Sequence, residues 1–162
     1  MEFIPAVKRV FFSKNYFKFS GRASRSEYWF SLLGFWLIIT ALMVLGFLAA
    51  LALGLTDSST GNMELAGALL ILVPYCLFFL YGFIPVLAVT CRRIHDLNHS
   101  GLWLILISVL YCIPLLGAVV GIGTVIWYSI KGTTGPNRFG EDPLAIDINP
   151  TDIYEDNQKK LD

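Results

Sequence analysis

Side chains able to do chemistry gather in three short segments, which long apolar runs separate. Each segment carries arginine, and guanidinium groups bind phosphate and carboxylate through paired hydrogen bonds. The candidate members of an anion-binding, lipid-binding or structural polar cluster are Arg22, Arg25, Glu27, Arg92, Arg93, His95, Asp96, Asn137 and Arg138. Helix capping and membrane anchoring already account for most of these residues, so a structural role and an anion site both stay open. We expect no catalytic residue among them.

His95 and His99 are the candidate metal ligands, because a spacing of four places two imidazole rings on one face of a helix. The His-Asp-x-x-His pattern differs from that of zinc proteases, which have glutamate after the first histidine as the general base. No third ligand is identifiable, and the three scattered cysteines form no metal or redox motif. The sequence favours a polar turn at the membrane interface, in which Asp96 pairs with Arg92 or Arg93. We therefore expect no metal and no cofactor.

The composition shows which elements must position these side chains. Hydrophobic residues make up 56% of the 162 residues and charged residues only 15%, against about 25% charged in an average soluble domain. Residues 28–56, 65–91 and 97–130 contain no Asp, Glu, Lys or Arg, and about 18 apolar residues suffice for a membrane span. This pattern excludes a soluble enzyme domain, a disordered chain and a disulfide scaffold. It predicts an all-α integral membrane protein, a small polytopic helical bundle.

Three regions follow from this pattern. Residues 1–27 are expected to be a basic, aromatic arm at the membrane interface, residues 28–143 the membrane domain, and residues 144–162 a polar, disordered tail. The arm places Val7, Val10, Phe11 and Lys14 at helical spacing, as in helices that lie on anionic headgroups. Membrane lipids are thus the expected partners of the arm, rather than nucleic acid.

The membrane domain holds three apolar segments, at about 28–55, 65–90 and 102–130. The first begins after a capping box, in which Ser24 caps the helix and Glu27 reaches back to the backbone N–H of Ser24. Pro74 and Pro85 are expected to interrupt the second segment, since proline removes a hydrogen-bond donor.

The third segment has two readings, because Pro114 and Gly117 break it near its middle. As a kinked span it would place Trp103 and Trp127 roughly 36 Å apart, in two interfacial belts. As a re-entrant hairpin, each half would hold about 14 residues, or roughly 21 Å of helix, short of the about 30 Å hydrocarbon core. Lysine and arginine in the arm and after the second segment predict a cytoplasmic N-terminus. We favour the hairpin, which places the C-terminus on the same side.

The landmark motifs resemble those of one bacterial inner-membrane family. They are GRASRSEYW at 21–29, RRIHD at 92–96, SGLW at 100–103 and GTTGPNRFG at 132–140. Together they resemble domain-of-unknown-function family 805, the YhaH/YhaI-like proteins, over about residues 10–143. The resemblance implies a small multi-pass protein of the bacterial inner (plasma) membrane and carries no biochemical activity.

We expect a non-enzymatic structural or interaction protein, whose cytoplasmic polar cluster holds helices together and contacts anionic lipid or a partner. The partner is a membrane protein or a second copy of the chain. A small-solute transporter or channel subunit is the alternative, and a membrane-embedded metal enzyme a remote one. Because ion pairs are less screened where water is scarce, Glu27 or Asp96 is expected to pair with an arginine from another segment.

Overall fold

The computed structural model describes residues 2–13, 16–55 and 64–145, which hold five α-helices and no β-strand. The helices are α1 (Phe3–Phe11), α2 (Arg25–Ala52), α3 (Leu65–Asp96), α4 (Leu102–Tyr111) and α5 (Leu116–Ser129). This confirms the all-α class. The loop expected between the first two spans, and the tail beyond residue 145, lie outside the described residues.

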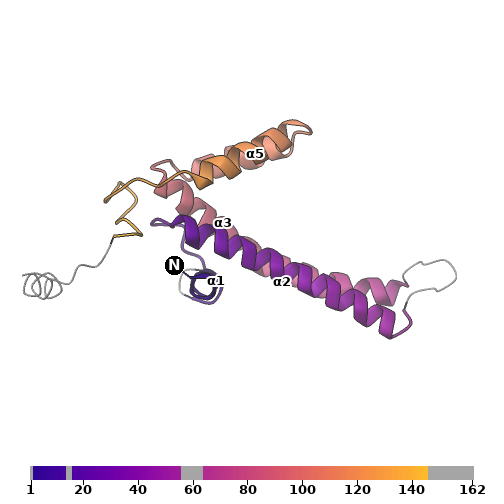
Figure 1. Ribbon diagram of the computed structural model, residues 1–162. Helices are drawn as coiled ribbons and strands as arrows, with labels where there is room; N and C mark the ends of the chain where they lie inside the picture. The colour runs from indigo at the N-terminus through magenta and orange to yellow at the C-terminus, as the bar shows by residue number, and fades with distance from the viewer. Residues whose placement is uncertain (1, 14–15, 56–63, 146–162) are drawn as a thin grey trace, which may run out of the picture.

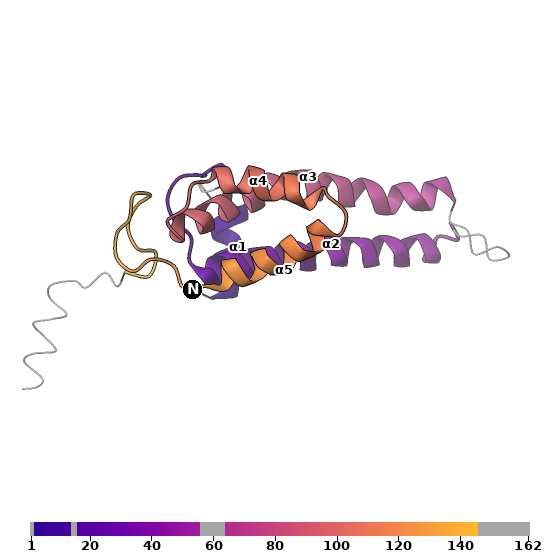
Figure 2. The ribbon, with the colours of Figure 1, turned by 90° about the horizontal axis from the view of Figure 1, so that it is seen from above.

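The long helices α2 and α3 run side by side in opposite directions and form the axis of the molecule (Figures 1 and 2). Both are long and apolar enough to cross a membrane, and only 17% of the residues in the most apolar stretch of each are buried. The core helix of a soluble protein would bury most of such a stretch. Exposed Leu45, Leu72 and Leu77 face outward instead, as side chains in contact with lipid do.

The helix that contains the second apolar segment extends beyond the end expected at residue 90. α3 continues to Asp96, so the RRIHD motif forms the last turns of a helix rather than a polar turn. α3 also runs through Pro74 and Pro85 as one continuous helix, so neither proline ends it. Pro85 has no N–H to donate to the carbonyl of Tyr81, and the Tyr16 hydroxyl donates to that carbonyl instead. Neighbouring groups of this kind make proline tolerable inside membrane helices.

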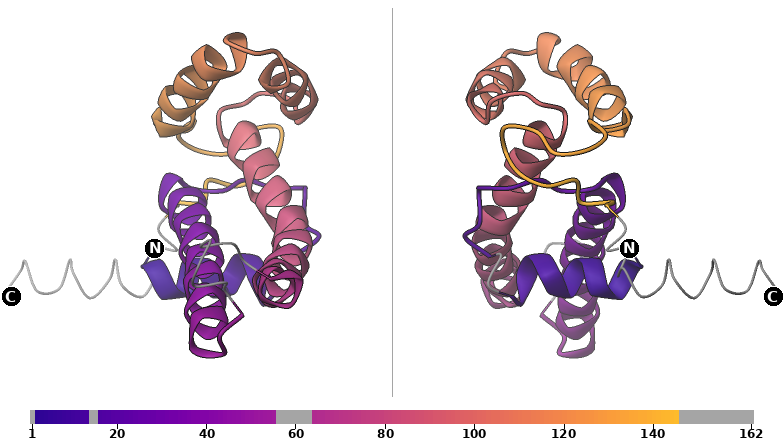
Figure 3. Two further views of the ribbon diagram at one scale, coloured as in Figure 1. Left: turned by 90° about the vertical axis from the view of Figure 1, so that its right-hand side faces the viewer. Right: turned by 90° about the vertical axis from the view of Figure 1, so that its left-hand side faces the viewer.

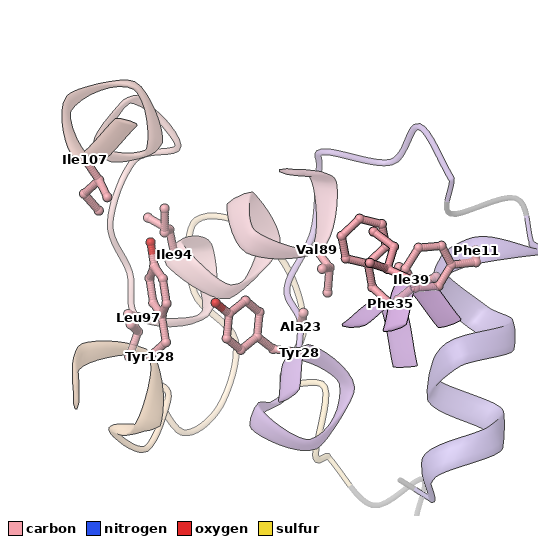
Figure 4. Packing of buried hydrophobic residues seen from close by; sticks show 11 residues of the cluster. Phe11, Ala23, Tyr28, Phe35, Ile39, Val89, Ile94, Leu97, Ile107 and Tyr128 are labelled. Carbon is pink, nitrogen blue, oxygen red and sulfur yellow. The ribbon is translucent and has the colours of Figure 1, made fainter. Parts of the chain in front are cut away.

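The arm helix α1 lies across the α2–α3 pair (Figure 3). A Cβ on Gly34 of α2 would lie 2.6 Å from Val7, so only glycine allows this approach. The Phe11 ring stacks on Phe35 at 6.2 Å, and the Tyr81 hydroxyl donates to the Phe11 carbonyl at 2.6 Å. The helical spacing expected in the arm is present at Val7, Val10 and Phe11, which pack against α2 and α3, whereas Lys14 lies outside the described residues. Figure 4 shows this end of the core.

The third apolar segment is a helical hairpin. α4 and α5 are joined at Cys112–Leu115, and the Tyr111 hydroxyl contacts the Thr124 hydroxyl at 2.7 Å. The ring centroids of Trp103 and Trp127 are 5.6 Å apart, whereas a continuous helix would separate them by roughly 36 Å. This distance excludes the kinked helix. The hairpin diverges from the long helices and stops well short of their far end (Figures 1 and 2).

Candidate functional site: a buried charge cluster

The three polar segments meet at one end of the molecule, where α2 begins and α3 and α5 end. The chain after α5, residues 130–142, crosses this end as an extended loop (Figure 3). We call the buried charged residues here the charge cluster; they are Arg22, Glu27, Arg92, Arg93 and Asp96.

Asp96 is shared by two buried arginines. Its Oδ1 accepts a hydrogen bond from Arg22 Nε at 2.9 Å, and Arg22 Nη2 lies 2.8 Å from the same oxygen. Its Oδ2 accepts a hydrogen bond from Arg93 Nη1. The side chains of Arg22, Arg93 and Asp96 are 1%, 0% and 4% exposed, respectively. Arg22 lies 74 residues before Asp96, so this pair ties the start of α2 to the end of α3.

The remaining donors of the two arginines bind backbone carbonyls of the chain that leaves the hairpin. Arg93 Nε donates to the carbonyl of Tyr128 at 3.0 Å, and its Nη2 to that of Ile130. Arg22 Nη1 donates to the carbonyl of Gly135 at 2.6 Å, and its Nη2 to that of Thr133. Both guanidinium groups thus hold the end of α5 and the loop after it.

Backbone contacts add to this attachment. Thr133 donates to the Asp96 carbonyl twice, through its amide at 2.9 Å and its hydroxyl at 3.1 Å. A Cβ on Gly132 would lie 1.9 Å from Asp96 Oδ2, so a side chain at this position is incompatible with the cluster. Asp142 accepts hydrogen bonds from the amides of Leu144 and Gly135 at 2.9 and 3.0 Å, which lower the pKa of its carboxyl below the usual value.

Glu27 and Arg92 form a second buried pair. Arg92 Nη1 donates to Glu27 Oε1 at 2.6 Å, and Arg9 of α1 approaches the same oxygen at 3.9 Å. Ser24 caps α2 as expected, by accepting a hydrogen bond from the Glu27 amide at 3.2 Å. The Glu27 carboxylate, however, is held by Arg92 and not, as the capping box predicted, by the backbone of Ser24. Arg92 also buries Nε and Nη2, which have no acceptor among the described residues.

The pairing expected from the sequence is confirmed for both acids, since Glu27 and Asp96 each meet an arginine from another segment. The partner of Glu27 is Arg92, so the two consecutive arginines serve different acids. Helical geometry explains this division, because neighbouring residues on a helix point in directions that are about 100° apart.

The two histidines have separate environments. α3 ends at Asp96 and Asn98 has φ 60°, so His99 lies beyond the helix and not one turn above His95. His95 Nδ1 lies 3.1 Å from the Gly21 carbonyl, and its ring stacks on Phe139 at 4.0 Å. The His99 ring instead meets Trp127 edge-on at 5.2 Å. The expected helical spacing of two metal ligands is therefore absent, and within the described ranges no group of three or more His, Cys, Asp or Glu residues could hold a metal ion.

The last three candidate residues lie around the charge cluster. Asn137 donates to the His95 carbonyl at 3.0 Å and so attaches the loop to α3. Arg138 and Arg25 are exposed; they donate to the carbonyls of Asn98 at 3.0 Å and of Ser129 at 3.5 Å. All nine candidate residues thus lie at one end, although only five of them are buried there.

A cavity of about 20 Å³ lies beside the cluster, between Arg93, Lys131 and Thr134 among others. About 10–15 Å³ of such space holds one water molecule. The cavity therefore has room for water and not for a phosphate group or a solute. What the described residues of the cluster do here is hold opposite charges in contact.

Several contributors to this site carried no sequence signal of their own. Thr133, Gly135 and Asp142 act through backbone groups or through turn geometry, and Phe139 through a ring contact. The GTTGPNRFG motif was a landmark of the family resemblance, and only its meeting with α3 makes its residues part of the site.

Comparison with known proteins identifies the family. The model described as "Protein of unknown function (DUF805)" matches residues 16–141. The chain belongs to the DUF805 family. The chain is 36% identical over 132 residues to the inner membrane protein YhaI of Escherichia coli strain K12. The aligned region covers 80% of this chain and 89% of YhaI. The chain is 32% identical over 130 residues to YhaH of the same strain, with 80% and 90% covered. No solved structure matches.

The DUF805 match confirms the resemblance seen in the motifs. The matched stretch contains all nine candidate residues and begins after α1. Both relatives are named as inner membrane proteins, and the two long apolar helices agree with that location. This DUF805 protein is therefore a membrane protein of helical fold.

Proposed function

We propose that this DUF805 protein is a non-enzymatic structural and interaction protein of the bacterial inner membrane, in which the charge cluster is a latch. The observation that carries this proposal is which acceptors the guanidinium groups of Arg22 and Arg93 bind. Within the described residues, all the hydrogen bonds of these two side chains go to Asp96 or to backbone carbonyls of residues 128–135. In a ligand-binding site, some of these donors would instead point into a cavity large enough to hold the ligand.

The same arrangement supports a cytoplasmic position for the cluster. Every lysine and arginine of the described residues lies in the arm, in the charge cluster or in the chain after α5. The opposite end carries only Glu64 among the charged residues that the structure describes. Since positive charge marks the cytoplasmic side, both the N-terminus and the chain after α5 belong there, and α2 and α3 are the two spans.

Aromatic rings mark the depth of the membrane surface in this placement. Tyr28 contacts Trp29 and Tyr128 at 4.9 and 5.2 Å, and Trp127 contacts both Tyr128 and Trp103 at 5.6 Å. These rings come from α2, α4 and α5 and lie next to the charge cluster. Tryptophan and tyrosine gather at the headgroup level of membranes. The cluster then lies at the cytoplasmic surface, and α4 and α5 enter the bilayer as a re-entrant hairpin.

The arm supplies a surface for lipid. Phe12 and Phe17 are each 70% exposed, and Lys8 and Lys18 are exposed nearby in the chain. Aromatic rings that enter the interface and lysines that meet phosphate are the two means by which interfacial segments bind anionic membranes. Anionic headgroups are therefore the partner that this surface fits, and a membrane-protein partner or a second copy of the chain would meet the apolar faces of the helices.

Hydrogen exchange tests the latch. The Thr133 amide donates to the Asp96 carbonyl, so its exchange reports whether the loop stays attached to α3. We expect Asp96→Asn to accelerate exchange across residues 130–135, and Glu141→Gln, which changes an exposed carboxylate on the same loop, to leave it unchanged. Unchanged exchange in Asp96→Asn, together with solute flux into vesicles that this variant abolishes, would make the protein a transporter instead.

Reporters active on only one side of the membrane test the topology. We expect fusions at both ends of the chain to be active in the cytoplasm. A periplasmic C-terminus combined with a cytoplasmic N-terminus would contradict the re-entrant hairpin and require a third span.

A further inference from the structure

The five helices are distributed unevenly along the axis of α2 and α3. All of them are present at the end that carries the charge cluster, whereas at the other end only α2 and α3 continue among the described residues (Figure 2). α1 crosses at the level of Ser31, whose hydroxyl donates to the Ala6 carbonyl at 3.4 Å, and of Gly34. The described part of the protein is therefore broad at the cluster and narrow at the opposite end.

Neither helix of the hairpin is long enough to cross the bilayer. α4 has 10 residues and α5 has 14, or about 15 and 21 Å of helix, and one leaflet contributes about half of the about 30 Å hydrocarbon core. Because the hairpin diverges from the long helices, its depth is smaller than its length (Figure 1). Its tip is apolar and exposed, with Leu115 86% and Ile113 45% accessible, so hydrocarbon suits it and water does not.

These helices add area to the leaflet on the cluster side. Two helices of about 10–12 Å diameter occupy roughly 160–230 Å² when they stand in a leaflet, and α1, which lies across α2 and α3, adds to this at headgroup level. The described residues place no matching element in the opposite leaflet. A molecule of this shape fits a bilayer whose cluster-side leaflet is the more spread of the two.

We propose that this protein binds preferentially where its cluster-side leaflet is convex and anionic. A convex leaflet has more area per lipid at its surface, where α1 lies and where α4 and α5 enter, and membrane binding by interfacial helices is sensitive to curvature. Lys8 and Lys18 add attraction to anionic headgroups. The inference rests on the re-entrant hairpin of the proposed function, and its partner is the lipid surface itself.

Orientation in vesicles of different diameter tests the inference. The full chain is reconstituted into phosphatidylethanolamine–phosphatidylglycerol vesicles, small and sonicated or large and extruded. The outer leaflet is convex, and strongly so only in small vesicles. In a cysteine-free background, Glu141→Cys reports the cluster side through its reaction with a membrane-impermeant thiol reagent. We expect the fraction of molecules with the cluster outward to rise as the diameter falls. Equal fractions in both sizes would overturn the inference.

One further measurement separates this result from the topology. Cys112 is exposed at the end of α4. Retained as the single cysteine, it should be shielded from the reagent in intact vesicles if the hairpin lies in the bilayer. Labelling of Cys112 from the water would overturn the hairpin placement and the inference together. A shielded Cys112 with equal orientation in both sizes would overturn the inference alone.

A matched pair of variants examines the hairpin itself. Leu115→Asp puts a charge at the tip, which opposes its entry into hydrocarbon, whereas Leu102→Asp puts the same charge at the base of α4, where Leu102 is 71% exposed beside the aromatic rings. We expect the dependence on diameter to be lost in Leu115→Asp and kept in Leu102→Asp. Full dependence in both variants would contradict the hairpin as its source.

Discussion

Replacing Asp96 by asparagine removes the carboxylate that Arg22 and Arg93 share and keeps the size of the side chain. Both guanidinium groups then stay charged at 1% and 0% exposure. Removing one partner of a buried ion pair costs about 3–5 kcal/mol, whereas an exposed pair contributes about 0–1 kcal/mol. Since one carboxylate here compensates two buried charges, we expect a loss of about 5 kcal/mol in the free energy of unfolding.

A double-mutant cycle separates this pairing from the other contacts of the cluster. Arg93→Met alone also leaves the buried Tyr128 carbonyl without its donor, at about 1–3 kcal/mol, and removes the donor of the part-buried Ile130 carbonyl. If Arg93 and Asp96 are partners, Asp96→Asn combined with Arg93→Met should cost less than the sum of the two single losses, because the second change no longer leaves a charge unpaired.

Unfolding in mixed detergent micelles provides the measurement, followed by helical circular dichroism as the denaturing detergent increases. Labelling of Cys91, a buried thiol beside His95, reports opening of the cluster itself once Cys76 and Cys112 are replaced by serine. Glu141→Gln is the control, since it neutralises an exposed acid. A loss in Asp96→Asn no larger than in this control, with Cys91 equally protected, would refute a buried pair.

Three further outcomes follow from the same contacts. Arg93→Lys should destabilise the protein far more than Arg92→Lys, by thermal unfolding, because Arg93 uses three nitrogens in fixed directions and Arg92 only one for its acid. Gly132→Ala should lower the unfolding temperature strongly and Gly123→Ala hardly at all, since a Cβ at the first position meets a carboxylate at 1.9 Å and at the second nothing within 4 Å. The folded-state pKa of Asp142 is lowered, so its contribution should be present above the unfolded-state pKa and lost as pH falls through the folded one. The difference in unfolding temperature between wild type and Asp142→Asn should therefore shrink on acidification, and a difference that grows would contradict this.

Local signals in the sequence were enough to predict the membrane helices and the residue at which α2 begins. Uncharged apolar runs of this length favour membrane helices, in which the backbone satisfies its own hydrogen bonds within the segment, and α2 begins where Ser24 provides a cap. Weak screening at the membrane interface also predicted that Glu27 or Asp96 would pair with an arginine from another segment. These conclusions depend on residue type and on near neighbours in the chain.

Only the tertiary structure decided how the elements meet. Pro114 and Gly117 are compatible with both a kink and a turn, and the contact between Trp103 and Trp127 shows that the segment is a hairpin. At Pro85, Tyr16 of the arm supplies the hydrogen-bond donor that the proline lacks. The assignment of acids to arginines joins residues 65 and 74 positions apart. Such contacts depend on which helix faces pack together, and that packing is a property of the whole fold that no single segment contains.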